Sequence, residues 1–229
     1  MVIYNPFQQY FWMKTTKKNV FDFPSAIGPL RIRLIAPGDE EYFLQFAQSL
    51  GAESRELFAP YQWGTNGQKK DFQDAIAGCE AGKDLSYLMF SPPGIPVGHL
   101  ALWGVERQHS LGGRNVRIPT LGICMADAFQ GKGLGRIGVK FLQDRALKSG
   151  ADAIELTFAP WNKRGEKLYR SLGFEDIGML RIPLGINPAT PDVDMRGVKT
   201  WREERHQVYI INPTPETAIK SYLRSKQKS

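Results

Sequence analysis

The segment "LGICMADAFQGKGLG" (residues 121–135) joins an apolar strand to the glycine-rich start of a helix. Small residues at the start of that helix leave its first backbone N–H groups open to a ligand. These N–H groups and the positive end of the helix dipole attract anions, and Lys132 and Arg136 add positive charge around them. The segment therefore predicts a binding site for a pyrophosphate.

Two other phosphate-binding motifs compete for the same residues, and neither fits. A P-loop requires a Ser or Thr hydroxyl after Gly131-Lys132 to hold magnesium, but this chain has Gly133 there. The spacing Gly133-x-Gly135-x-x-Gly138 matches a dinucleotide fingerprint, and Glu155 lies on the following strand. That fingerprint opens a series of parallel β-α-β units, whereas consecutive strands joined by hairpin turns precede it here. Close packing of Gly138 against a strand explains this glycine instead.

Strands and helices are expected on both sides of the segment, from the periodicity of apolar residues and the positions of Gly and Pro. The expected strands are 30–35, 84–90, 95–107, 116–126, 153–158 and two that flank the loop 185–197. One expected helix begins after Asp39, and three others cover residues 68–82, 133–149 and 162–173. Strands that first meander and then alternate with helices predict a single α/β domain, with a mixed, mostly antiparallel sheet flanked by helices.

We expect this domain to cover residues 29–212. Residues 1–28 are rich in aromatic side chains and are predicted to form an N-terminal extension that packs on the domain. Residues 213–229 form a basic C-terminal tail, for which a solvated, frayed end is the simplest interpretation.

Composition excludes several classes of protein. The 229 residues are 42% hydrophobic, which is enough for one sizeable core, and no apolar run is long enough to cross a membrane. The net charge of +7 favours anionic partners, but no basic stripe with interleaved aromatics supports nucleic-acid binding. Cys79 and Cys124 are far apart in the sequence and indicate reduced thiols in a cytoplasmic protein. His99, His109 and His206 are scattered along the chain, so no metal site is predicted.

Two motifs together resemble the GCN5-related N-acetyltransferase (GNAT) family. Gln130-x-x-Gly133-x-Gly135 matches the loop with which that family holds the pyrophosphate of coenzyme A (CoA). "LTFAPWNKRGEKLYRSLGF" (156–174) resembles the strand, the Asn, the Leu-Tyr and the Leu-Gly-Phe of the family's second motif. The order and spacing of the two motifs also match, over residues 116–182. The resemblance implies the acyl-CoA N-acyltransferase fold.

The resemblance also implies roles for individual residues. Tyr169 corresponds to the general acid that protonates the departing thiolate, and Asn162 to the side chain that reaches the pantetheine amides. The implied CoA-binding residues are Ile123, Met125, Gln130, Gly131, Lys132, Gly133, Leu134, Gly135, Arg136 and Asn162. Two positions depart from the usual family pattern: Asp127 replaces a common proline, and Gly165 a common alanine.

The activity implied is direct transfer of an acetyl group from acetyl-CoA to a primary amine, without a metal. A protein N-terminus, a lysine and a small amine all remain open as the acceptor, as do a monomer and a homodimer. The alternative functions are a catalytically silent CoA-binding sensor or scaffold and, with less support, a nucleic-acid-binding protein. A slow basal hydrolysis of acetyl-CoA would distinguish an enzyme from the silent protein.

The general base and the determinants of amine selectivity follow less directly from the motifs. Glu106, His99, Asp127 and His206 are all candidate bases, and Glu106 is the one we favour. The loop 185–198, together with the early helices, is expected to control which amine is accepted. Within that loop, the carboxylates of Asp192 and Asp194 are candidates for attracting a cationic amine.

Overall fold

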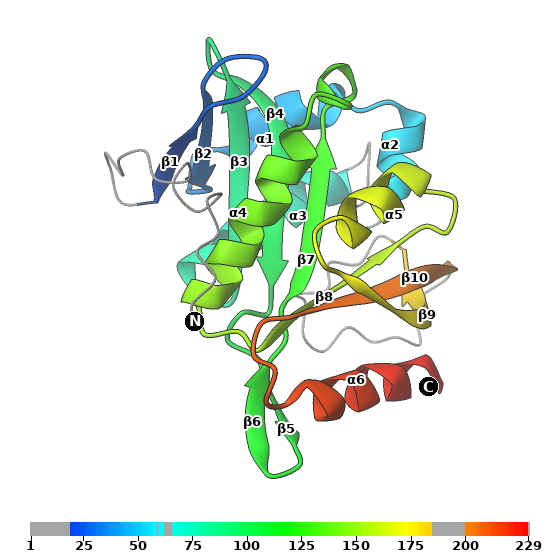
Figure 1. Cartoon of the computed structure of the whole chain (residues 1–229). Helices are drawn as coiled ribbons and strands as arrows, with labels where there is room; N and C mark the ends of the chain where they lie inside the picture. The colour runs from blue at the N-terminus through cyan, green and yellow to red at the C-terminus, as the bar shows by residue number, and fades with distance from the viewer. Residues whose placement is uncertain (1–18, 59, 62–65, 185–199, 229) are drawn as a thin grey trace, which may run out of the picture.

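A computed structural model describes residues 19–58, 60, 61, 66–184 and 200–228 (Figure 1). Eight strands form one sheet in the order β1-β2-β3-β4-β7-β8-β10-β9, and β5 and β6 form a separate hairpin. All neighbouring strands in the large sheet run antiparallel except β7 and β8. The expected mixed, mostly antiparallel sheet is confirmed.

The strands of the large sheet are β1 (Val20–Phe23), β2 (Leu30–Leu34), β3 (Leu85–Ser91), β4 (Ile95–Trp103), β7 (Thr120–Met125), β8 (Ala153–Phe158), β9 (Glu175–Pro183) and β10 (Trp201–Ile210). The hairpin consists of β5 (Gln108–Leu111) and β6 (Arg114–Arg117). The helices are α1 (Glu40–Gln48), α2 (Ala52–Leu57), α3 (Asn66–Glu80), α4 (Leu134–Lys148), α5 (Lys163–Arg170) and α6 (Glu216–Ser225). Among these, no helix is long and apolar enough to span a membrane.

Helices cover both faces of the sheet because side chains alternate between the faces along each strand. On one face, Leu100 of β4 packs in a cluster with Leu142 of α4. On the other face, Ala101 packs with Phe43 of α1 and Phe72 of α3. The α4 helix lies so close to the sheet that a Cβ at Gly138 would be 2.8 Å from side-chain atoms of Ile123 and Leu100. Close packing therefore accounts for this glycine, as predicted.

The sheet opens between β7 and β8. These parallel strands share one registered pair, Thr120 with Glu155, at the start of β7. Beyond that pair the strands diverge, and Figure 1 shows β8 turning away from β7. The gap lies beside the start of α4, because the chain leaves β7 at Met125 and enters α4 at Leu134.

Several elements differ from the sequence predictions. The strand expected over 95–107 ends at Trp103, since Gly104 adopts φ 70° and starts a turn, and the strand expected over 116–126 is divided between β6 and β7. The short helix α2 was not expected. Part of the expected N-terminal extension forms β1, an edge strand paired with β2, while residues 1–18 lie outside the described residues.

The expectation of a frayed C-terminal end is wrong. Residues Glu216–Ser225 form α6, which completely buries Ile219 and Leu223. These side chains pack with Val208 of β10 and Ile177 of β9. Of the basic residues of this segment, Arg224 is exposed on α6, whereas Lys226 follows the helix and pairs with Glu155.

Candidate active site

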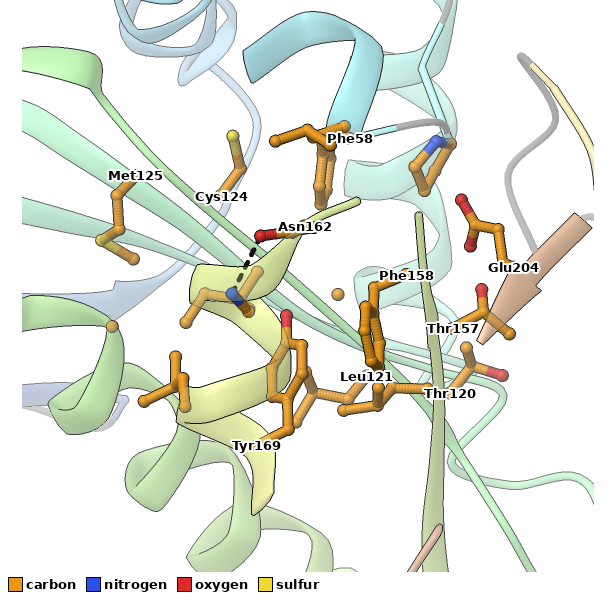
Figure 2. A pocket seen from close by; sticks show the side chains of 18 of the residues that line it. Phe58, Thr120, Leu121, Cys124, Met125, Thr157, Phe158, Asn162, Tyr169 and Glu204 are labelled. Carbon is orange, nitrogen blue, oxygen red and sulfur yellow. Dashed lines mark hydrogen bonds between the residues drawn. The ribbon is translucent and has the colours of Figure 1, made fainter. Parts of the chain in front are cut away.

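A pocket of about 530 Å³ occupies the gap between the diverging strands (Figure 2). Residues from α2, β7, the start of α4, β8, α5, β9 and β10 line it. The volume lies within the usual range for sites that bind small molecules.

The glycine loop forms one end of the pocket. Gly131 and Gly133 have φ values of 73° and 81°, in the left-handed region where a side chain would cause strain. Both residues line the pocket, with Gly135 and Arg136, at the N-terminus of α4. The Arg136 guanidinium donates a hydrogen bond of 2.9 Å to the Ser171 hydroxyl. This end combines open backbone N–H groups with a fixed positive charge, which suits a bound phosphate.

A hydrogen-bond network links the loop to α2. The Gln130 side-chain amide donates to the Met125 carbonyl at 3.1 Å and to the Ser54 hydroxyl at 2.9 Å. The Ser54 hydroxyl donates to one Asp127 oxygen at 2.6 Å, and the Gly51 N–H donates to the other at 2.9 Å. Asp127, at a position where the family often has proline, therefore holds the first turn of α2 against the loop.

Tyr169 lies on the opposite wall, on α5. Its ring packs against Phe158 and Phe174, with centroids 5.5 and 5.9 Å away. Figure 2 shows its hydroxyl directed toward the middle of the pocket. Burial raises the pKa of Tyr169, and the nearby Cys124 and Glu204 raise it further, so the hydroxyl keeps its proton at neutral pH. A protonated hydroxyl in this position is a proton donor to whatever the pocket holds.

Asn162 positions α5 through a helix cap. Its side-chain oxygen accepts a hydrogen bond of 2.8 Å from the Gly165 N–H at the start of α5. A Cβ at Gly165 would approach the Asn162 side chain within 2.8–3.0 Å. Glycine at this position, where the family often has alanine, therefore leaves room for a close cap.

The structure brings most of the expected CoA-binding residues together. The pocket is lined by Ile123, Met125, Gln130, Gly131, Gly133, Gly135, Arg136 and Asn162, along with Tyr169. Lys132 and Leu134 do not line it. The Lys132 ammonium group lies 5.1 Å from the centre of the Phe129 ring, and Leu134 is 1% exposed in the core.

None of the four candidate bases lines the pocket. Glu106 is exposed in the turn after β4, and Asp127 is engaged with Ser54 and Gly51. His99 is fully buried among aromatic rings, and burial lowers its pKa to about 3. His206 is fully buried and donates to Glu155. Asp192 and Asp194 lie outside the described residues.

Two carboxylates that the sequence analysis did not select do line the pocket, Glu155 of β8 and Glu204 of β10. Both are buried, with 8% and 2% of their surface exposed. A sequence signal for Glu204 was present, because strand alternation in "WREERHQV" (201–208) places it on the same face as the buried Val208. An acidic residue on the core face of a strand is uncommon, and here it marks the pocket.

Comparison with known proteins gives the family. A family model described as "Acetyltransferase (GNAT) family" matches residues 47–174, more than half of the chain. The chain belongs to the GNAT acetyltransferase family. The membership, the GNAT fold and the class of enzyme, an acyltransferase, are thereby confirmed. No curated protein matches the chain significantly.

Solved structures of acetyltransferases share the GNAT fold at low sequence identity. Ribosomal-protein-S5-alanine acetyltransferase from Vibrio fischeri has a TM-score of 0.64 and 14% identity, covering 86% of this chain and 98% of its own. Mycobacterium smegmatis RimJ, in complex with CoA-disulfide, has a TM-score of 0.62 and 15% identity, and the match covers 91% of this chain and 95% of RimJ. Spermidine N-acetyltransferase from Vibrio cholerae, in complex with CoA and spermine, has a TM-score of 0.59 and 15% identity, covering 79% and 95%.

Proposed function

We propose that this GNAT protein transfers an acetyl group from acetyl-CoA directly to a primary amine. The observation that carries the proposal is that one pocket contains both the glycine-lined start of α4 and the buried hydroxyl of Tyr169. The first feature suits a pyrophosphate, and the second supplies a proton. Direct acyl transfer from acetyl-CoA needs a site for the pyrophosphate at one end of the pantetheine arm and a proton donor for the thiolate at the other.

The pocket residues suit the pyrophosphate and the pantetheine arm of CoA. Gly131, Gly133 and Arg136 would hold the pyrophosphate at the helix N-terminus. On the side of β7 that faces the gap, no described strand pairs with the backbone beyond Thr120. Backbone groups near Ile123 are therefore available to pair with the amides of a pantetheine arm, while the Met125 carbonyl already accepts a hydrogen bond from Gln130.

The proposed reaction requires few chemical groups from the protein. Acetyl-CoA supplies an activated thioester, so the protein has to orient that group, admit the amine in its neutral form and protonate the thiolate that leaves. The nitrogen loses one proton as the amide forms, and this proton balances the one that Tyr169 gives to the thiolate. The buried Tyr169 hydroxyl keeps its proton because burial raises its pKa, and it directs that proton into the pocket. Among the described residues, no cluster of His, Cys, Asp or Glu has the arrangement of a metal site.

Protein and small-molecule amines both remain acceptors under this proposal. The similar structures include an enzyme named for a ribosomal-protein alanine and one named for spermidine. Incubating the protein with acetyl-CoA and an amine panel, and measuring free thiol, tests the proposal. The panel should contain spermidine, a lysine peptide and a peptide with a free N-terminal alanine. Amine-dependent thiol release supports transfer. Tight binding of CoA without thiol release, even by hydrolysis, would instead support the silent CoA-binding protein.

A further inference from the structure

The two buried carboxylates of the pocket face the same side of the sheet. Val208 pairs with Glu155 and His206 with Thr157 in the β10–β8 ladder, so Glu204, His206, Glu155 and Thr157 share one face. Leu156 and Phe158 point to the other face, into the cluster that packs on α4. Figure 2 shows Thr157 and Glu204 at the end of the pocket away from Cys124 and Met125.

Glu155 has partners on both carboxylate oxygens. The His206 ring donates to Oε2 at 3.0 Å, and the Lys226 ammonium group lies 2.9 and 3.1 Å from the two oxygens. The Thr120 hydroxyl is 3.4 Å from Oε1. Burial alone would raise the pKa of Glu155, but the hydrogen bond from His206 and the charge of Lys226 lower it to about 2. Glu155 is therefore an ionised group whose charge is already compensated.

The hydrogen bonds that other described residues donate to Glu204 go to one of its oxygens. Two nitrogens of the Arg202 guanidinium, Nε at 2.9 Å and Nη2, donate to Oε1. Neither of these hydrogen bonds involves Oε2. The Glu204 side chain is 3% exposed and is one of the residues that line the pocket. A carboxylate that lines the pocket can accept a hydrogen bond from a ligand there.

Arg202 is itself held in place, which fixes the orientation of Glu204. Its Nη1 donates to the Glu56 carbonyl at 2.7 Å, and its guanidinium lies 5.6 Å from the centre of the Trp161 ring. The Arg202 side chain is 10% exposed. Arg202 thus fixes Oε1 of Glu204, and Oε2 is the oxygen that we consider for a ligand.

We propose that Glu204 is the acceptor-binding residue, whose Oε2 accepts a hydrogen bond from the ammonium group of a cationic primary amine. The inference rests on the proposed function and names the substrate class. The aromatic rings of Phe58 and Trp103 line the same pocket, and ring faces also attract an ammonium ion. Burial, Cys124 and then the charge of Glu204 raise the pKa of Tyr169, which indicates that Glu204 lies near the proton donor. An amine held by Glu204 thus shares the pocket with the Tyr169 hydroxyl.

The first test is binding of amines to the CoA-saturated protein, measured by calorimetry near pH 7 with n-butylamine and spermidine. Glu204→Gln should weaken this binding about 10- to 100-fold, the loss typical for a hydrogen bond to a charged group. Glu203→Gln, which changes an exposed acid on the same strand, is the matched control and should bind like wild type. Wild-type protein that binds CoA but neither amine would overturn the inference.

The second test compares amines that differ in charge. For spermidine, Glu204→Gln should raise KM by a similar factor, whereas p-anisidine, which is neutral near pH 7, should show less than about a twofold change. Glu204→Asp should keep the preference for the cation. An equal rise of KM for both amines in Glu204→Gln would contradict the role of Glu204 in binding the ammonium group. Kinetics of Glu204→Gln that match those of Glu203→Gln would contradict it as well. Failure of wild type to bind CoA contradicts the proposed function instead.

If Glu204→Gln does not fold normally, a double variant can still test the inference. Removing one partner of a buried ion pair leaves an uncompensated charge, so Glu204→Gln requires a check of thermal stability and CoA affinity. The double variant R202M/E204M removes both charges at once and leaves none unpaired. It should bind CoA normally and lose its preference for spermidine over p-anisidine. A double variant that retains the preference would refute the assignment.

Discussion

At the scale of single residues, the Tyr169 hydroxyl is the group to which we assign the role of proton donor. It lies in the pocket on a helix whose first turn Asn162 caps, and the Phe158 and Phe174 rings hold its aromatic ring. Rigid packing of the ring and a hydroxyl directed into the pocket are what a proton donor requires. The ring and the hydroxyl can therefore be separated by mutation.

Tyr169→Phe should lower kcat about 10²- to 10⁴-fold, because it removes the proton donor and keeps the ring contacts. The dissociation constant of CoA should stay nearly unchanged. Tyr209→Phe is the control, since Tyr209 packs against Phe174 without lining the pocket. Steady-state kinetics with the best amine of the panel provide the measurement. An unchanged kcat, with the chemical step shown to be rate-limiting, would reduce Tyr169 to a packing residue.

Gly133→Val should abolish or strongly weaken CoA binding. The φ of 81° makes any side chain strained by about 2 kcal/mol, and a branched one would also cover the helix N-terminus. Gly113→Val is a matched control: Gly113 has φ 80° and lies in the β5–β6 hairpin turn, away from the pocket. Both variants should lose similar stability, but calorimetry should show impaired CoA binding for Gly133→Val alone. Equal CoA affinities in the two variants would argue against the loop as the pyrophosphate site.

At the scale of elements, α2 depends on the loop before α4. Asp127 accepts hydrogen bonds from the Gly51 N–H and the Ser54 hydroxyl, which are groups of the first turn of α2. The same helix contributes Ser54 and Leu57 to the pocket. The position of the loop that suits CoA is thus coupled to a helix that shapes the rest of the pocket.

Asp127→Ala should destabilise the protein by about 1–2 kcal/mol, because it removes the acceptor for both α2 groups. It should also raise KM for the amine more than KM for acetyl-CoA, since α2 is released while the glycines of the loop remain. Asp22→Ala, which breaks an exposed ion pair with Arg31, is the control and should have little effect on stability. Thermal unfolding and kinetics with both substrates measure the outcome. A larger effect on KM for acetyl-CoA would show that Asp127 serves the loop rather than α2.

Sequence predicted those elements whose residues satisfy local backbone requirements. The glycines before α4 and the Asn at the start of α5 are read from short motifs, because a left-handed turn and a helix cap each involve a few neighbouring positions. Glu106 illustrates the limit: the apolar pattern continues to Val105, but the turn at Gly104 ends β4 earlier and exposes Glu106. The helix α6 was not predicted because its segment is rich in basic residues. Ile219 and Leu223 nevertheless have the i, i+4 spacing of a buried helix face. Arg202 and Glu204 are two residues apart on β10, so their pairing is local, but their place beside the pocket depends on tertiary contacts and was not predicted.

At the scale of the whole molecule, buried ionisable groups determine how stability depends on pH. His99 is fully buried, its Nε2 lies 2.7 Å from the Ser86 hydroxyl, and its pKa is lowered from 6.5 to about 3 by burial. The folded state therefore keeps this ring neutral, while the unfolded state binds a proton below pH 6.5. Since the unfolded state binds more protons, stability is complete above pH 6.5 and decreases as the pH falls toward 3.

We expect the free energy of unfolding to fall between pH 6.5 and 5, with His99 contributing up to about 1.4 kcal/mol per pH unit. His99→Gln should have a shallower slope in this range, because glutamine does not titrate. Urea unfolding at several pH values measures the slope. Below pH 4.5 the lowered pKa of Glu155 adds a second loss of stability in both proteins, as that carboxylate is protonated on unfolding. An identical slope for wild type and His99→Gln above pH 5 would rule out His99 as the source.

The single registered pair between β7 and β8 gives the sheet an internal edge. On one side of it lie β1, β2, β3, β4 and β7, and on the other β8, β10 and β9. A ligand whose amides pair with β7 would act as an inserted strand and complete this edge. Amide protons of β7 that point toward β8 should exchange rapidly with solvent deuterium in the free protein and slowly with CoA bound. Those that point toward β4 should be protected in both states, so hydrogen exchange reports directly whether the cofactor is also part of the sheet.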